Sequence, residues 1–239
     1  MSNFELLSFA NDRALAEGAA GQWLNQLETD VQATTPYCVA LSGGRIARRF
    51  FEAVVGLAKA GRSPPGSIHF FWGDERCVPP DDAESNFGMA RELLLAPLNI
   101  PEAQIHRVRG EELPASAAAQ AEAELRRIAP AEGGGQPVLD LVFLGMGEDG
   151  HVASLFPGES EEVMAAKAVY RPVAAVKPRS GRVTLGYAAI AAARQTWVLA
   201  SGAGKEAALR ESFTPSGRTP LARMLKLRRR TKIFTNILQ

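Results

Sequence analysis

The chain has 239 residues and a formal net charge of +1, and 46% of its residues are hydrophobic while 22% are charged. This balance is usual for a globular protein, and a near-neutral chain has no global basic field to attract nucleic acid or an anionic membrane surface. We therefore expect no nucleic-acid or membrane partner, and any affinity for phosphate has to come from a local site.

The cysteines, the histidines and the N-terminal segment narrow the class further. Cys38 and Cys77 form no CxxC pair and the chain has only three histidines, so we expect neither a metal site nor a cofactor. Residues 1–18 include early acidic side chains and lack the apolar centre of a signal peptide, and no apolar stretch reaches about 18 residues. These features predict a cytoplasmic protein.

Segments with helical spacing of apolar residues alternate with short apolar runs that end in glycine or turn residues. In chain order, the pattern predicts a helix over 12–31, a strand over 37–41, a helix over 45–59, a strand over 68–72, helices over 86–95 and 116–128, strands over 138–144 and 168–176, a helix over 186–193, a strand over 195–200, a helix over 204–212 and a strand over 232–237.

Continuous apolar strands separated by helices are typical of a parallel sheet covered on both faces. We therefore predict an α/β fold, a Rossmann-like three-layer sandwich with a mostly parallel sheet and helices on both faces. The chain shows no linker and no internal repeat. A single domain over residues 1–239 is expected.

Four of the predicted strands end in loops that are rich in glycine and polar residues. These loops are residues 42–44, 73–76, 145–151 and 201–205. In open α/β sheets, ligands bind beyond the carboxyl ends of the strands. We expect the four loops to meet at one edge of the sheet and to form the ligand site.

Two of the loops have the chemistry of an anion site. Gly43 and Gly44 stand between a buried strand and the start of a helix, where free backbone N–H groups and the helix dipole favour an anion. Lys205 follows a second glycine-rich turn and can add a point charge for a phosphate. Taken singly, each loop also fits a plainer interpretation, a tight turn or a solvated lysine on the first turn of a helix.

Residues 145–150 match the dinucleotide pattern GxGxxG, but their context argues against a dehydrogenase. The preceding strand comes late in the chain, and Pro157 prevents a long helix after the loop. Glu148 and Asp149 would moreover face the pyrophosphate dianion.

The same loop contains the candidate general base. Asp149 and His151 are separated by one glycine, and a histidine held by a nearby carboxylate is the usual arrangement of a base near neutral pH. His69 and His106 lack such a context and are interpreted as structural.

The polar loop after the second strand suits a sugar ligand. Two carboxylates and Arg76 follow the strand, where they can meet hydroxyl groups and an anionic group. Ser85 or Asn86 is expected to cap the following helix. The other acidic residues are expected to be solvated loop charges: Asp81, Asp82 and Glu84.

Two long segments resemble the signature regions of one family. WGDERCVPPDDAESN (residues 72–86) and LDLVFLGMGEDGHVASLFPG (residues 139–158) are similar to 6-phosphogluconolactonases, which form a wider family with the glucosamine-6-phosphate isomerases (deaminases). The order SGG, GDER, GMGEDGH, KP…RVT and SGAGK extends the resemblance over most of the chain. The resemblance implies an enzyme that hydrolyses 6-phospho-D-glucono-1,5-lactone to 6-phospho-D-gluconate in the pentose phosphate pathway, without a metal. We expect a monomer or weak homo-oligomer.

The resemblance also implies where the substrate phosphate binds. Gly43 and Gly44 would present backbone N–H groups to it, helped by Arg182 and Lys205. Arg76 would contact the substrate near the phosphate or the ring.

For catalysis, the resemblance implies that His151 activates the attacking water or assists the ring oxygen as it leaves, and that Asp149 orients the imidazole. Asp74 matches the position of the proton-transferring aspartate in the deaminase branch, and we include it in the site.

Departures from the family pattern bear on the choice of branch. Arg45 begins the segment that replaces the usual Ser-Thr-Pro after SGG, so its charge would replace hydroxyl donors at the phosphate. A deaminase would be expected to have a tyrosine in place of Arg76 and Asn-Glu-Pro in place of residues 154–157. The resemblance thus favours the lactonase, with a deaminase or a non-catalytic sugar-phosphate-binding protein as alternatives.

Overall fold

A six-stranded parallel sheet forms the centre of the computed structural model, which describes residues 4–31, 35–62, 64, 66–129, 131, 135–175, 180–228 and 230–237. Each strand pairs in parallel with its neighbours. The order across the sheet is β1 (Phe4–Ser8), β9 (Thr231–Thr235), β8 (Gln195–Ala200), β5 (Leu141–Gly145), β2 (Tyr37–Leu41) and β3 (Ile68–Trp72).

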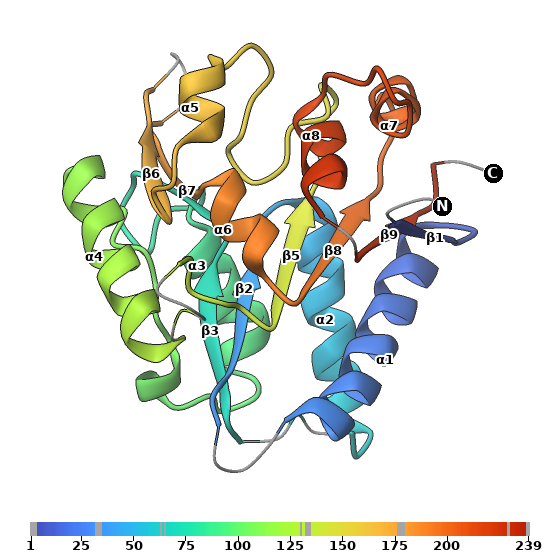
Figure 1. Cartoon of the computed structure of the whole chain (residues 1–239). Helices are drawn as coiled ribbons and strands as arrows, with labels where there is room; N and C mark the ends of the chain where they lie inside the picture. The colour runs from blue at the N-terminus through green and yellow to red at the C-terminus, as the bar shows by residue number, and fades with distance from the viewer. Residues whose placement is uncertain are drawn as a thin grey trace.

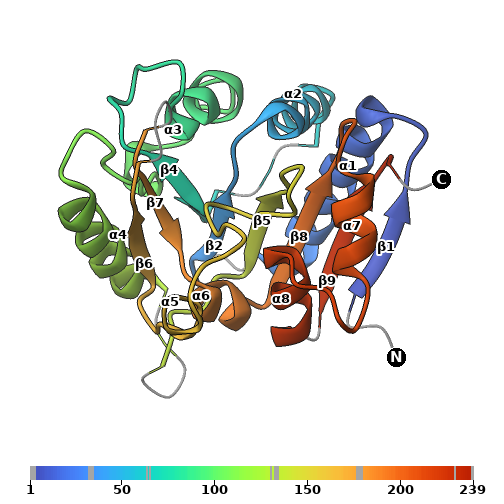
Figure 2. The ribbon, with the colours of Figure 1, turned by 90° about the horizontal axis from the view of Figure 1, so that it is seen from above.

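Helices cover both faces of this sheet (Figures 1 and 2). On one face, α1 (Asp12–Asp30) packs beside α2 (Arg45–Lys59). On the other face, α6 (Tyr187–Ala192) contacts α8 (Pro220–Leu227), and α7 (Glu206–Ser212) lies next to α8. The predicted three-layer α/β sandwich with a mostly parallel sheet is confirmed.

A cluster of aromatic rings joins the sheet to α1 and α2. The Phe143 ring of β5 lies 5.4 Å from Trp23, 4.7 Å from Phe50 and 5.7 Å from Trp197, measured between centroids. All four side chains are buried. Burying one such side chain contributes roughly 1.5–3 kcal/mol to the stability of the fold, so the cluster holds the central strands against α1 and α2.

A second, antiparallel sheet stands beside the carboxyl end of β3 (Figure 1). It consists of β4 (Asp74–Arg76), β7 (Arg182–Leu185) and β6 (Tyr170–Val173), and α4 (Pro114–Ile128) packs against β6 and β7. The strand expected over 168–176 as part of the parallel sheet is thus shorter and belongs here, while residue 176 lies outside the described residues. Strands of three or four residues leave too little periodicity for prediction.

Several smaller elements also depart from the expectation. The helix expected over 86–95 is present as α3 (Asn86–Ala90) followed by a π-helical turn (Arg91–Leu95). β1, α8 and a short helix α5 (Glu161–Ala165) were not expected, nor was a 3₁₀ turn at Glu102–Gln104. None of the described helices combines the length and the apolar character that a bilayer crossing demands.

Candidate active site

The four loops expected to form the site do meet at the carboxyl edge of the sheet. β8, β5, β2 and β3 are consecutive in the sheet, so the loops that follow them are neighbours. A hollow of about 170 Å³ lies among them. Every predicted site residue except Asp149 lines it: Gly43, Gly44, Arg45, Asp74, Arg76, His151, Arg182 and Lys205.

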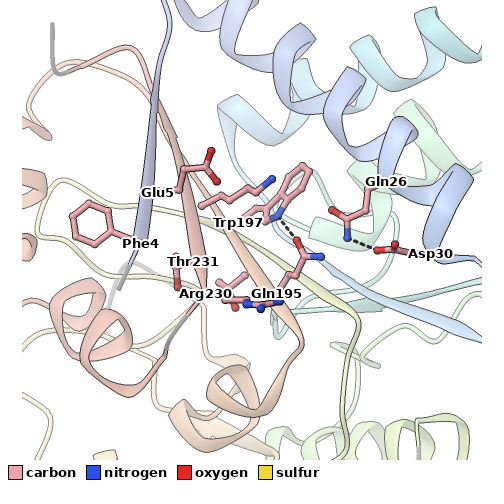
Figure 3. A pocket seen from close by; sticks show the side chains of 10 residues that line it. Phe4, Glu5, Gln26, Asp30, Gln195, Trp197, Arg230 and Thr231 are labelled. Carbon is pink, nitrogen blue, oxygen red and sulfur yellow. Dashed lines mark hydrogen bonds between the residues drawn. The ribbon is translucent and has the colours of Figure 1, made fainter. Parts of the chain in front are cut away.

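A larger hollow of about 480 Å³ lies at the opposite edge, between the first residues of β1, β8 and β9 and the last turns of α1 (Figure 3). It contains none of the predicted site residues and no histidine. We place the site in the smaller hollow at the carboxyl edge, because only that hollow contains predicted site residues and a histidine.

The turn at residues 42–44 leaves the start of α2 open to an anion. Gly44 is the N-cap residue with φ of +91°, no side chain caps the helix, and the first turn contains no acidic residue. The free N–H groups and the helix dipole therefore point toward the hollow uncompensated. Ser42 ties this turn to the next loop, since its Oγ accepts a hydrogen bond from the Gly145 N–H at 3.0 Å.

Arg45 and Lys205 form a cationic group beside this turn. The guanidinium of Arg45 lies against Gly202, and the Lys205 Nζ donates to the Met146 carbonyl at 2.6 Å. Burial and the repulsion by Arg45 lower the pKa of Lys205, and Glu148 offsets this in part. A bound dianion would relieve the repulsion between the two cations.

A second cationic group comes from the antiparallel sheet. Arg76 and Arg182 are directly opposite each other on β4 and β7 and both line the hollow. Like charges in opposite positions on adjacent strands repel each other. Among the described residues that line the hollow, four cationic side chains face a single carboxylate, that of Asp74. The hollow therefore favours an anionic ligand.

His151 carries its own orienting carboxylate. Its Nδ1 lies 2.6 Å from Asp149 Oδ1, which also accepts the His151 backbone N–H at 3.1 Å. Burial alone would raise the pKa of Asp149, but the hydrogen bonds from His151 outweigh it and lower the pKa. In the tautomer whose Nδ1–H donates to this carboxylate, Nε2 carries the lone pair of the ring.

A tight turn fixes the His151 ring. The Gly147 N–H donates to the His151 carbonyl at 2.9 Å, and a Cβ added to Gly147 would overlap the imidazole. Behind the turn, the Leu221 N–H at the start of α8 donates to the Gly150 carbonyl at 3.1 Å. No helix begins within residues 151–160, in agreement with the argument from Pro157.

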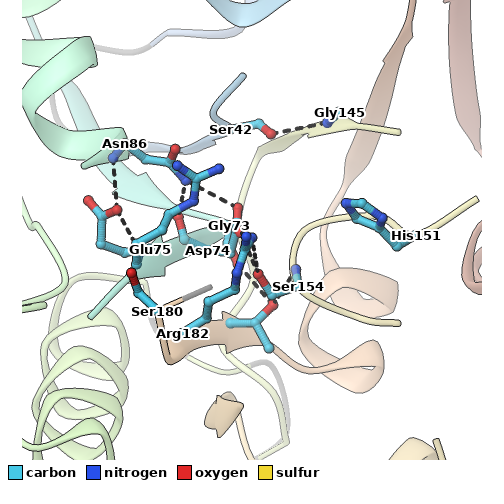
Figure 4. A network of polar contacts seen from close by, with 12 residues as sticks. Ser42, Gly73, Asp74, Glu75, Asn86, Gly145, His151, Ser154, Ser180 and Arg182 are labelled. Atoms are coloured by element: carbon cyan, nitrogen blue, oxygen red, sulfur yellow. Dashed lines mark hydrogen bonds and ion pairs between the residues drawn. The ribbon is translucent and has the colours of Figure 1, made fainter. Parts of the chain in front are cut away.

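Asp74 is buried and held by several groups (Figure 4). The Ser154 hydroxyl donates to its Oδ2 at 2.6 Å, and the Arg182 Nη1 lies 3.7 Å from the same oxygen. The Asn86 amide donates to the Asp74 carbonyl at 2.9 Å. This carboxylate is therefore a fixed negative charge within the wall of the hollow.

Sequence reasoning missed Ser154 and Asn86 at this site. It also expected Glu75 to meet sugar hydroxyls, whereas Glu75 does not line the hollow. Ser85 caps α3, as expected, because its Oγ accepts from the Gly88 N–H at 3.0 Å. Asn86 lines the hollow instead. Glu75 is 2% exposed and burial raises its pKa, although three backbone N–H groups donate to it. The sequence could not show that Asn86 lines the hollow, because serine and asparagine are equally good helix caps by residue type.

Within the described residues, no group of three or more histidine, cysteine or carboxylate side chains has the geometry of a metal site.

Comparison of the chain with known proteins identifies its family. The family model of glucosamine-6-phosphate isomerases/6-phosphogluconolactonase matches residues 10–233. The chain belongs to this family.

Members of the glucosamine-6-phosphate isomerase/6-phosphogluconolactonase family with known sequences or structures resemble the chain along most of its length. It is 37% identical over 194 residues to the 6-phosphogluconolactonase of Nostoc sp., covering 81% of this chain and 78% of the relative. The crystal structure of the devB protein shares 31% identity with this chain, with a TM-score of 0.87 and 98% coverage of both chains. The 6-phosphogluconolactonase of Trypanosoma brucei shares 28% identity with a TM-score of 0.83, covering 99% of this chain and 98% of that one.

Proposed function

We propose that this chain hydrolyses 6-phospho-D-glucono-1,5-lactone to 6-phospho-D-gluconate as an enzyme of the pentose phosphate pathway in the cytoplasm. The relatives named 6-phosphogluconolactonase support the assignment. One observation carries it in the structure: the paired imidazole of His151 shares a hollow with four cationic side chains. An ester carbon and a dianion on one small molecule match that arrangement.

In this proposal the substrate phosphate lies at the start of α2. The backbone N–H groups after Gly43 and Gly44 would donate to it, with Arg45 and Lys205 on one side. Arg182 would approach from the antiparallel sheet. Arg76, opposite Arg182, would contact the phosphate or the lactone ring.

His151 would act as general base on the attacking water. As the water oxygen bonds to the lactone carbonyl carbon, Nε2 takes its proton and Asp149 stabilises the imidazolium. Collapse of the tetrahedral intermediate breaks the bond between that carbon and the ring oxygen. The imidazolium then returns its proton to the ring oxygen, which becomes the free hydroxyl of 6-phosphogluconate.

Asp74 is proposed as a site residue that fixes the charges around it. Its contact with Arg182 holds that cation in the hollow, and the Ser154 hydroxyl shares the same carboxylate oxygen. Ser154 begins the segment in which a deaminase would be expected to carry Asn-Glu-Pro. The absence of that second carboxylate favours lactone hydrolysis over amine release.

A coupled assay with fresh phosphorylated lactone, corrected for spontaneous hydrolysis, tests the proposal. His151→Ala should lower kcat by about 10²–10⁴-fold with little change in KM, because a general base contributes about that much. Lys205→Ala should mainly raise KM. Lys226→Ala is its matched control, since the Lys226 Nζ also donates to a backbone carbonyl but lies outside the hollow.

Three outcomes would contradict the proposal. Wild-type turnover in His151→Ala would exclude that residue as the base, and equal KM values in Lys205→Ala and Lys226→Ala would exclude the phosphate assignment. Ammonia release from glucosamine 6-phosphate would assign the deaminase reaction instead. Turnover should also persist unchanged in excess chelator, since we propose a reaction that needs no metal.

A further inference from the structure

Asn86 is a buried polar residue that lines the hollow. It is the first residue of α3 and only 2% exposed, and Ser85 already caps the helix. Its amide is therefore available for other contacts, and both ends of it make one.

The nitrogen end of the amide faces Asp74. Asn86 Nδ2 donates to the Asp74 carbonyl at 2.9 Å and lies 3.4 Å from the carboxylate Oδ1. Because Ser154 donates to Oδ2, the two side chains contact opposite oxygens of the carboxylate. Figure 4 shows Asn86 and Ser154 on either side of Asp74.

The oxygen end of the amide occupies the space beside Gly43. A Cβ added at Gly43 would overlap the Asn86 side chain, whose atoms are the three nearest to that position. The backbone of Gly43 has no positive φ that would itself require glycine. Gly43 is therefore a glycine, at least in part, because Asn86 fills the place of its side chain.

Glu75 holds the backbone of Asn86 in place. Its Oε1 accepts the N–H groups of Asn86 at 2.8 Å and of Arg76 at 2.7 Å, and its Oε2 accepts that of Phe87 at 2.7 Å. A buried carboxylate with this many donors fixes its neighbours, since losing any one of them leaves a buried polar group unpaired. The Asn86 side chain thus projects from a rigid anchor.

We propose that Asn86 is a positioning residue that joins the two sides of the hollow, orienting the Asp74 carboxylate with its nitrogen and setting the place of the 42–44 turn with its oxygen. The inference rests on the proposed lactone hydrolysis. Asn86 thereby sets the separation between the anion site at α2 and the charges on the antiparallel sheet.

Removing the amide should misplace both neighbours. We expect Asn86→Ala to lower kcat/KM by about ten- to hundred-fold, as small displacements in a site commonly do. Asn11→Ala is the control for lost helix stability, because it removes the cap of α1 outside the hollow and should lower the melting temperature with little change in kcat/KM. Equal losses in the two variants would overturn the proposal, since they would point to helix stability alone.

A double-mutant cycle with Gly43→Ala tests the contact itself. In the wild-type background the added methyl collides with Asn86, whereas in the Asn86→Ala background the space is open. Gly43→Ala should therefore cost much more activity in the first background than in the second. Independent effects that multiply would refute the contact.

Asn86→Asp provides a readout that a purely structural role would not change. It places a second carboxylate against Asp74, and two adjacent carboxylates share protons. The pH profile of kcat/KM should gain a transition that is absent from Asn86→Ala. An unchanged profile would contradict the orientation of Asp74 by Asn86.

The crystal structure of Asn86→Ala decides the matter without reference to turnover. A shift of the Asp74 carboxylate and of the 42–44 turn would support the inference even if wild type failed to hydrolyse the lactone, a result that would sink only the proposed function. An unmoved carboxylate and turn would overturn the inference in an active enzyme and in an inactive one alike.

Discussion

His151 and Asp149 are only two residues apart, so their contact depends on how sharply the chain turns between them. The turn is tight enough that the imidazole lies over Gly147, in space that any side chain there would fill. The position of the His151 ring thus accounts for glycine at residue 147, without the approach of a phosphate.

Replacing Gly147 with alanine should therefore displace the proposed base, His151, although His151 itself is not mutated. The added methyl would push the His151 ring aside, and we expect kcat to fall by about 10²-fold or more in the lactone assay. Gly56→Ala is a suitable control, since a Cβ there meets no neighbour and a helical alanine is favourable. Equal kcat values in the two variants would contradict the account of the turn.

Residue types predicted part of the site and concealed the rest. His151 and Lys205 stand out in sequence because their neighbours in the chain explain no other role for them. Ser154 and Asn86 do not, since a small polar residue always has a cheaper local explanation such as a cap or a turn. Only their position against Asp74, far away along the chain, reveals what they contact.

At the scale of elements, the antiparallel sheet supplies half of the hollow. Its pairing puts Asp74 opposite Thr184 and Arg76 opposite Arg182, and no residue of β4 or β7 could be placed in this way from the sequence. The parallel strands were predictable because each is a continuous apolar run. The short strands were not, because three or four residues give too little periodicity, and β6 and β7 pack on the distant helix α4.

His69 of β3 and His106, which lies in the loop before α4, form a chain of hydrogen bonds outside the hollow. His69 Nδ1 is 2.8 Å from His106 Nε2, and His106 Nδ1 is 2.7 Å from Glu124. The His106 ring also stacks on Phe71 with 4.6 Å between centroids. This network supports the structural interpretation of both histidines.

The network predicts a pH-dependent stability. Burial lowers the pKa of both His69 and His106, with the neighbouring imidazole adding to the effect on His69. A histidine with a lowered pKa binds its proton more readily when unfolded. The melting temperature should therefore fall as the pH drops below about 6.5, the ordinary histidine pKa, and should stay level above it as far as these groups are concerned.

Thermal unfolding between pH 5 and pH 8 checks this expectation. The carboxyl groups of Glu111 and Glu124, with pKa values of about 2, lose their contribution mainly below this interval. Burial raises the pKa of Glu75 and Asp140, which opposes the decline, so a histidine variant is needed to isolate the effect of the histidines. His69→Gln should flatten the decline relative to wild type. Parallel curves for the two proteins would show that this pair does not contribute.

At the scale of the whole molecule, we expect residues 1–239 to unfold as one domain. The buried side chains of both sheets and of α1, α2 and α4 form one continuous cluster. Differential scanning calorimetry should show a single transition, and 6-phosphogluconate at 100 times its Kd should add about 2.7 kcal/mol to the free energy of unfolding. Two separate transitions would divide the chain into domains.

The fold as a whole was more predictable than its parts. A doubly covered parallel sheet needs only a repeated alternation of apolar runs and helices, which this chain provides. The carboxyl ends of neighbouring strands then come together of necessity, so the four loops could be assigned to one edge before any distance was known. The arrangement of charges around the hollow could not be predicted in this way, because Asp74, Arg76 and Arg182 come from the second sheet.

The self-contained turn at residues 147–151 has a kinetic consequence. Since the imidazole moves together with the Asp149 carboxylate, a rigid shift of this turn changes how close the ring comes to a bound molecule while the contact between the two side chains is kept. α8 braces the turn from behind through Leu221 and Gly150. Substitutions that change how α8 packs behind the turn should therefore alter turnover in the proposed reaction, although none of them touches His151 or Asp149.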